Sequence, residues 1–182
     1  VSGQTGYVLA LAFLFVFLFH GTAFLTLRLA KTSLVLRCQE VALKNGAIAV
    51  IFFVLCMAMT LGYTDLFTKP VAAVALVGAA LFFVMAMLSM KLGKGKASFL
   101  LSSAAIVATT VAFFAGLFPR LMVSSLNPAW SLTITKASSS PYTLSVMTVA
   151  AGIFVPIVLI YQSWSYYIFR KRVTAKDAEE HY

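Results

Sequence analysis

Long runs of apolar residues, each about the length of a membrane crossing, divide the sequence into five segments. A helix needs about 20 mainly apolar residues to cross the hydrocarbon core of a bilayer. None of the five segments has an Asp, Glu, Lys or Arg in its interior. The predicted spans are 6–27, 47–63, 71–90, 97–118 and 144–169. The pattern therefore predicts an all-α fold, a polytopic transmembrane helix bundle that forms one domain over residues 1–182.

The basic residues between the spans predict how this bundle is oriented. The connections after the first and third spans and the C-terminal tail hold four, three and four Lys or Arg, whereas the other two connections hold one and two. Loops rich in Lys and Arg stay in the cytoplasm. We therefore expect the N-terminus and the loop 119–143 outside, and the tail 170–182 in the cytoplasm.

Composition agrees with a membrane protein and excludes several other classes. Hydrophobic residues make up 62% of the chain and charged residues 10%, whereas a soluble domain carries roughly a quarter charged residues. This excludes an ordinary soluble enzyme, a disordered tail and a secreted disulfide scaffold. The net charge of +9 would suggest nucleic acid in a soluble protein, but basic residues between apolar segments favour a membrane surface and no nucleic acid partner. The start of the chain has no basic region before a short apolar core, so no signal peptide is expected.

Two connections are expected to have structure of their own. Residues 31–45 are predicted to form a short amphipathic helix on the inner membrane surface, separate from the second span. In the outer loop, Trp130 and Tyr142 are either interfacial aromatic residues or part of a loop that packs over the outer face, and both interpretations stay open. Pro156 lies inside the last span, where it predicts a kink.

Small residues recur every four positions along the fourth span and form a predicted packing stripe. Such a stripe lets a second helix approach closely. Intramolecular packing is favoured over contact with another subunit. The stripe consists of Ala104, Ala108, Ala112 and Gly116.

Candidate chemistry within the spans is sparse. His20 and Gln162 are the most polar groups there, and no intramembrane carboxylate, metal-ligand spacing, phosphate loop or catalytic triad is found. We therefore expect no catalytic residue and no metal site in this chain. His20 is interpreted first as a buried residue that hydrogen-bonds to a neighbouring helix; a contact with a lipid or quinone headgroup, haem ligation and proton transfer are the alternatives. Gln162 is likewise expected to have a structural use, with a buried polar or quinone contact as the alternative.

The last third of the sequence resembles the C-terminal region of subunit II of cytochrome bd-type quinol oxidases. The residues that carry the resemblance are FP at 118–119, ASSSPYTL at 137–144 and VPIVL at 155–159, and LFHGTAFLTLR at 18–28 is similar to the fifth span of that family. The family's subunit II has two four-helix bundles and one extra helix. The chain resembles the second bundle and the extra helix, so a fragment of a longer subunit or a split gene is expected.

The resemblance implies a subunit of a heterodimeric terminal oxidase in a bacterial or archaeal cytoplasmic membrane, which oxidises quinol and reduces dioxygen to water. It implies that haem b and haem d are bound by subunit I, and that this chain binds no haem and supports the stability of that partner. In some members subunit II holds a structural quinone, and a small accessory subunit is a further partner. From the residues alone, a small oligomeric transporter and a passive membrane anchor stay open as alternatives.

Overall fold

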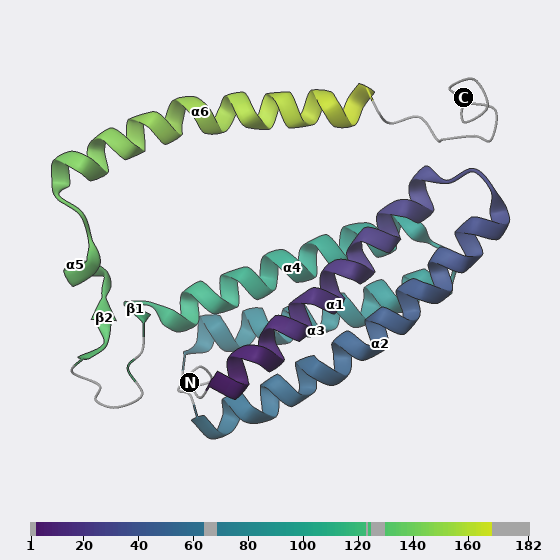
Figure 1. The fold of residues 1–182 in the computed structure, drawn as a ribbon, viewed down its shortest axis with the longest axis horizontal. Coiled ribbons are helices and arrows are strands. Elements are labelled where there is room, and N and C mark those ends of the chain that lie inside the picture. Colours follow the sequence, from purple (N-terminus) through teal and green to yellow (C-terminus); the bar gives the residue numbers. More distant parts are fainter. Residues whose placement is uncertain (1–2, 64–68, 123, 125–129, 169–182) are drawn as a thin grey trace.

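Five long helices dominate the computed structural model, which describes residues 3–63, 69–122, 124 and 130–168 (Figure 1). The elements are α1 (Gly3–Arg28), α2 (Thr32–Tyr63), α3 (Pro70–Lys91), α4 (Gly95–Leu117), β1 (Arg120–Met122), β2 (Leu132–Thr133), α5 (Ile134–Ala137) and α6 (Pro141–Ile168). Each of the helices α1, α2, α3, α4 and α6 is long and apolar enough to cross a membrane. The predicted all-α, polytopic helix bundle is confirmed. The tail 170–182 lies outside the described residues.

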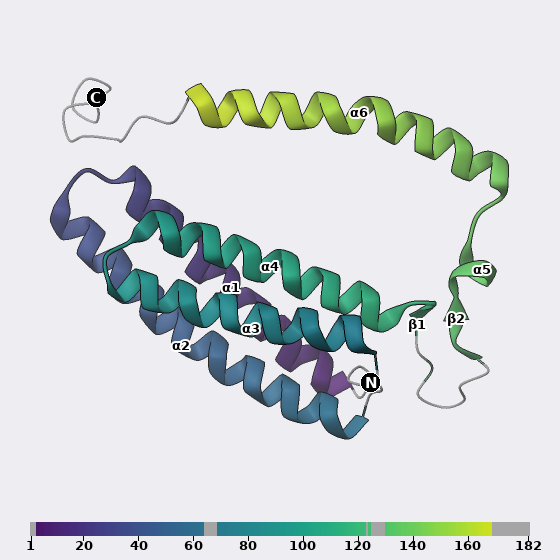
Figure 2. The same ribbon diagram turned by 180° about the vertical axis from the view of Figure 1, so that it is seen from behind.

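Helices α1 to α4 form a four-helix bundle made of two antiparallel hairpins (Figures 1 and 2). Helix α1 packs along α2, and α3 packs along α4; contacts of α1 with α4 and of α2 with α3 join the hairpins. The short α1–α2 and α3–α4 turns lie at the same end of the bundle. Basic residues are concentrated at this end, in the two turns and in the helix ends next to them.

The core of the bundle consists of small residues around a few large ones. Phe19 and Phe83 meet edge to face with ring centroids 5.1 Å apart, and Met90 is fully buried beside them. Alanines from all four helices close this core: Ala23, Ala42, Ala49, Ala86 and Ala105. In lipid, helices associate through close packing because apolar exclusion from water is absent, so small residues at the contact favour this arrangement.

The structure corrects the prediction for residues 31–45. These residues are the first half of α2, which runs without a break from Thr32 to Tyr63, and they do not form a separate surface helix. Gly46 lies inside this helix and does not end it. It allows α1 and α2 to approach closely, because a Cβ atom at this position would lie 3.0 Å from Phe19 Cδ2. The more polar first half of α2 and its apolar second half thus form one continuous helix.

The α3–α4 turn is built around Gly93, whose φ of 73° lies in the left-handed region. The amide of Gly93 donates to the Met90 carbonyl, and the amide of Lys94 donates to the Ser89 carbonyl. This is the Schellman motif, in which a glycine just after the helix satisfies the last carbonyls. The turn therefore fixes the first residues of α4 beside the ends of α1 and α3.

The segment after α4 differs from the bundle. A cis peptide bond joins Phe118 and Pro119, and the short strands β1 and β2 pair antiparallel with Arg120 opposite Thr133. This strand pair was not predicted from the sequence. Trp130 and Tyr142 are both exposed. Helix α6 is continuous through Pro156 and has no buried residue, and Figures 1 and 2 show it curved and set apart from the bundle.

Candidate functional site

The polar contact between α1 and α4 at membrane depth is made by His20. Its Nδ1 atom lies 2.8 Å from Oγ of Ser102, a residue 82 positions later in the chain. The imidazole ring also stacks on Phe99, with ring centroids 4.6 Å apart. His20 is half-buried and Ser102 is fully buried.

The hydrogen bonds of Ser102 indicate which nitrogen of His20 carries the proton. Ser102 Oγ lies 2.9 Å from the Phe99 carbonyl, to which it donates. A hydroxyl has one proton, so Ser102 can only accept from His20. Nδ1 therefore carries a proton and donates it to Ser102 Oγ.

The serines and threonines that flank the predicted stripe bond back to their own helix. Ser103 donates to the Phe99 carbonyl, Thr109 to the Ala105 carbonyl and Thr110 to the Ile106 carbonyl. Ser102 both bonds back and reaches α1. Ser102 lies on the buried face of α4, with Ser98 and Ala105 one turn away on either side.

An aromatic cluster extends from the His20 contact toward α6. Phe24 of α1 lies 5.7 Å from Phe99 and 6.2 Å from Tyr166 of α6, measured between ring centroids. The guanidinium carbon of Arg28 lies 5.0 Å from the centre of the Phe24 ring, which is cation–π geometry. The end of α6 thus meets the bundle through Tyr166.

Two polar atoms near this cluster are buried without a hydrogen-bond partner in the part of the chain that the structure describes. They are Nη1 of Arg28 and Oγ of Ser98. Buried polar groups in folded proteins nearly always have partners. The ends of α1 and α4 therefore have unused donors where they meet.

Gln162 and the predicted stripe have different surroundings. Gln162 is exposed on α6. In the stripe, Ala112 is buried, while Ala104, Ala108 and Gly116 are half-buried. The residues that α4 buries fully are a partly different set, Ser98, Ser102, Ala105 and Ala112.

The lone lysine of the α2–α3 connection, Lys69, is bonded to the C-terminal end of α4. Its Nζ donates to the Gly116 carbonyl at 2.7 Å and to the Phe118 carbonyl. A cation at a helix C-terminus satisfies the last carbonyls and the helix dipole. Lys69 is therefore part of the packing of the end opposite the α3–α4 turn.

Among the described residues, no group of three or more His, Cys, Asp or Glu that could hold a metal ion is found. His20 is the one histidine in this part of the chain, and its ring is stacked on Phe99 and bonded through Nδ1 to Ser102.

Comparison with known proteins gives a consistent result. A family described as cytochrome bd terminal oxidase subunit II matches residues 3–169. The chain is 36% identical over 164 residues to cytochrome bd ubiquinol oxidase subunit 2 of Bacillus subtilis, covering 87% of this chain and 47% of that protein. It is 34% identical over 96 residues to cytochrome bd-I ubiquinol oxidase subunit 2 of Escherichia coli K12, covering 53% of this chain and 25% of that protein. The chain spans less than half the length of these relatives.

Proposed function

The chain belongs to the cytochrome bd terminal oxidase subunit II family, and from this premise we propose that it is the non-haem-binding subunit of an oxidase in a bacterial cytoplasmic membrane. The whole complex oxidises quinol and reduces dioxygen to water. Haem b and haem d are held by a partner, subunit I. This chain contributes to the assembly and stability of that partner.

The main support for the proposal is a contrast within this chain: helices α1–α4 form a packed bundle, whereas the apolar helix α6 has no buried residue. The one histidine among the described residues is engaged in a contact between α1 and α4. Helix α6 is apolar, spans the length of a membrane and has no buried residue. Such a surface suits a subunit whose use is to pack against other parts of a complex.

The role of His20 in this proposal is that of a positioning residue. Its Nδ1–H bond to Ser102 and its stacking on Phe99 hold α1 and α4 in register. Because the His20 ring is used in this way, His20→Gln is expected to keep the haem spectrum of the complex and most of the assembly. Loss of one haem signal with the assembly intact would contradict the positioning role.

The proposal is tested by purifying the tagged chain from membranes in mild detergent and recording a dithionite-reduced minus oxidised visible spectrum. Mass spectrometry identifies the proteins that accompany it. Bands of haem b and of a chlorin-type haem d, together with a larger partner, are expected. A purified chain with neither haem nor partner would contradict the proposal.

A further inference from the structure

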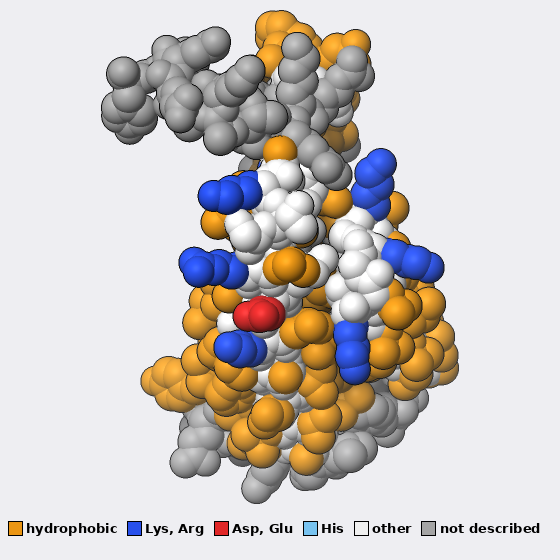
Figure 3. All heavy atoms as spheres, turned by 90° about the vertical axis from the view of Figure 1, so that its right-hand side faces the viewer, with side chains coloured by type: hydrophobic (Ala, Val, Ile, Leu, Met, Phe, Trp, Pro, Cys, Tyr) orange, Lys and Arg blue, Asp and Glu red, His pale blue; other side chains and the backbone are white. Residues whose placement is uncertain are grey.

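The bundle end that contains the α1–α2 and α3–α4 turns is strongly basic. Figure 3 shows Lys and Arg side chains gathered over this end around a single acidic side chain. By their positions in the elements, the charged residues of this end are Arg28, Lys31, Arg37, Glu40, Lys44, Lys91, Lys94 and Lys96. Such a surface attracts anions, and in a membrane protein the nearest abundant anions are lipid phosphates.

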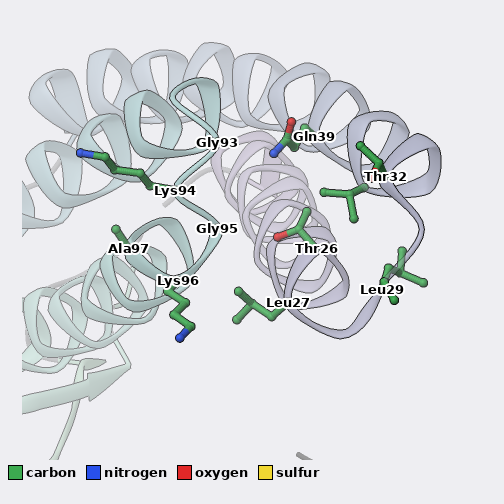
Figure 4. A pocket seen from close by; sticks show the side chains of 12 residues that line it. Thr26, Leu27, Leu29, Thr32, Gln39, Gly93, Lys94, Gly95, Lys96 and Ala97 are labelled. Carbon is green, nitrogen blue, oxygen red and sulfur yellow. The ribbon is translucent and has the colours of Figure 1, made fainter. Parts of the chain in front are cut away.

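A cavity of about 570 Å³ opens at this end between the last turn of α1, the first turns of α2 and the α3–α4 turn (Figure 4). Its polar lining comes from two corners of the bundle, the α1–α2 corner and the α3–α4 corner: Thr26, Thr32, Gln39, Lys94 and Lys96. No carboxylate lines it. The cavity therefore presents hydroxyl and amide groups and no acidic group, and the exposed side chains of Lys94 and Lys96 extend outward from its rim (Figure 4).

The first turn of α4 adds backbone donors to the same cavity. Gly95, Lys96 and Ala97 line it, and α4 has no side-chain cap. Among the described residues, the amide of Ser98 donates to the Lys94 carbonyl, and no acceptor is found for the amides of the three residues before it. Free amides at the N-terminus of a long helix, together with the helix dipole, bind anions.

Two contacts at this corner keep those donors in place. A Cβ atom on Gly95 would lie 2.7 Å from Thr26 Oγ1, so the backbone of α4 approaches α1 as closely as a glycine allows. Gly93 fixes the turn that precedes it, with both of its Schellman hydrogen bonds formed. Ser98, in the first turn of α4, has a fully buried hydroxyl without a partner among the described residues. The corner is thus rigid and rich in unused donors.

We propose that this cavity binds the phosphodiester of an anionic glycerophospholipid, such as phosphatidylglycerol. The phosphate is held by Lys94, Lys96 and the free amides at the start of α4. The hydroxyl of Thr32 and the amide of Gln39 are available to the glycerol headgroup.

A lipid is favoured over a free phosphate ion by the size and the apolar part of the cavity. Leu27, Leu29 and Val35 also line it, and their side chains suit the glycerol and the first acyl carbons. A volume of about 570 Å³ is within the range of about 300–1,000 Å³ that is typical of sites for organic molecules. The cavity also lies at the end of membrane-spanning helices, where lipid headgroups are found.

The test measures which lipid stays with the purified, otherwise delipidated complex after it is offered an equal mixture of phosphatidylglycerol and phosphatidylcholine, read by native mass spectrometry. The wild type is expected to retain phosphatidylglycerol. In the double variant Lys94→Gln/Lys96→Gln retention is expected to fall roughly tenfold, because each basic residue near the surface contributes to the attraction.

The matched control is Lys44→Gln/Lys91→Gln, which removes two positive charges from the same end but from residues that do not line the cavity. Its retention is expected to stay close to that of the wild type. Equal losses in both double variants, or no loss in either, would overturn the site. Displacement of the bound phosphatidylglycerol by a large excess of inorganic phosphate would overturn the lipid as the ligand. Retention of the lipid under that excess would support it.

A second measurement covers the case in which the double variant does not assemble. The wild-type complex is labelled with a photoactivatable phosphatidylglycerol that carries the reactive group next to the phosphate. Crosslinks are expected on peptides that contain residues 26–39 and 93–97. Labelling spread evenly over the membrane-facing helices would overturn the proposal.

Discussion

The bundle α1–α4 and the helix α6 are similarly apolar, but the bundle has a buried core and α6 has no buried residue. In the bundle, Phe19 is fully buried against Phe83, and alanines from every helix close the space around them. In α6, no residue is buried, although its length and hydropathy are those of a membrane span. The chain itself therefore buries residues of four helices, whereas α6 meets the bundle at Tyr166 and has no buried residue.

The difference shows that apolar composition inserts a helix into a membrane but does not pack it. Packing in lipid depends on small residues and polar contacts that face a partner helix. Helix α6 has such residues in Ala150, Ala151 and Gly152, and no helix of the described chain covers them. We therefore expect the same substitution to have different effects in the two regions.

The largest expected effect is that of Phe19→Ala compared with Phe154→Ala. Phe19 is fully buried and Phe154 is exposed. Replacing a buried phenylalanine by alanine costs about 3–5 kcal/mol of unfolding free energy, whereas an exposed substitution stays within about 0.5 kcal/mol. The measurement is the unfolding free energy of the purified protein in an SDS titration. Equal losses would break the comparison, because α6 would then be packed as tightly as α1.

The next effect tests the small residues directly, with Ala112→Leu compared with Ala151→Leu. Ala112 is buried in α4, and Ala151 is exposed in α6. Adding three carbon atoms to a packed position costs about 1–3 kcal/mol. The heat-stable fraction of the complex on size-exclusion chromatography is expected to fall for Ala112→Leu. Unchanged stability and haem content in that variant would show that Ala112 is not a packing contact.

A third pair compares two glycines, Gly93→Ala and Gly152→Ala. Gly93 has a φ of 73°, a conformation that costs an L residue about 1–2 kcal/mol. Gly152 lies inside α6 with open space around it, where alanine is the better helix former by about 0.5–1 kcal/mol. Thermal unfolding should therefore shift down for the first variant and up for the second. A downward shift for Gly152→Ala would indicate that something covers this face of α6.

The sequence predicts the number and type of the helices well because the spans are long apolar runs with charged or proline ends. It does not predict that α2 is continuous, because Gly46 is equally compatible with a helix end and with the close approach to Phe19 that the structure shows.

The rotation of the helices is the second thing that the sequence does not provide. Residues 97–118 are apolar on every side, so the predicted stripe through Ala104 and Ala108 and the buried face through Ser98 and Ser102 fit the pattern equally well. The two sets share Ala112. The His20 contact could not be predicted for the same reason. The sequence shows that His20 can form a hydrogen bond, but its partner, 82 residues away, depends on the rotation of the helices.

The smallest expected effect is the energy of the hydrogen bond between His20 and Ser102, which sharpens the comparison because it measures one polar contact inside the bundle. A double-mutant cycle with His20→Phe and Ser102→Ala isolates it, since phenylalanine can keep the stacking on Phe99 and lacks the N–H donor. Such bonds within membranes average about 0.6 kcal/mol, with a maximum near 1.7 kcal/mol. In the control cycle, Ser103→Ala takes the place of Ser102→Ala. Ser103 bonds back to its own helix, so its coupling energy with His20 is expected to be near zero. Equal coupling in both cycles would mean that His20 stabilises α4 through packing alone.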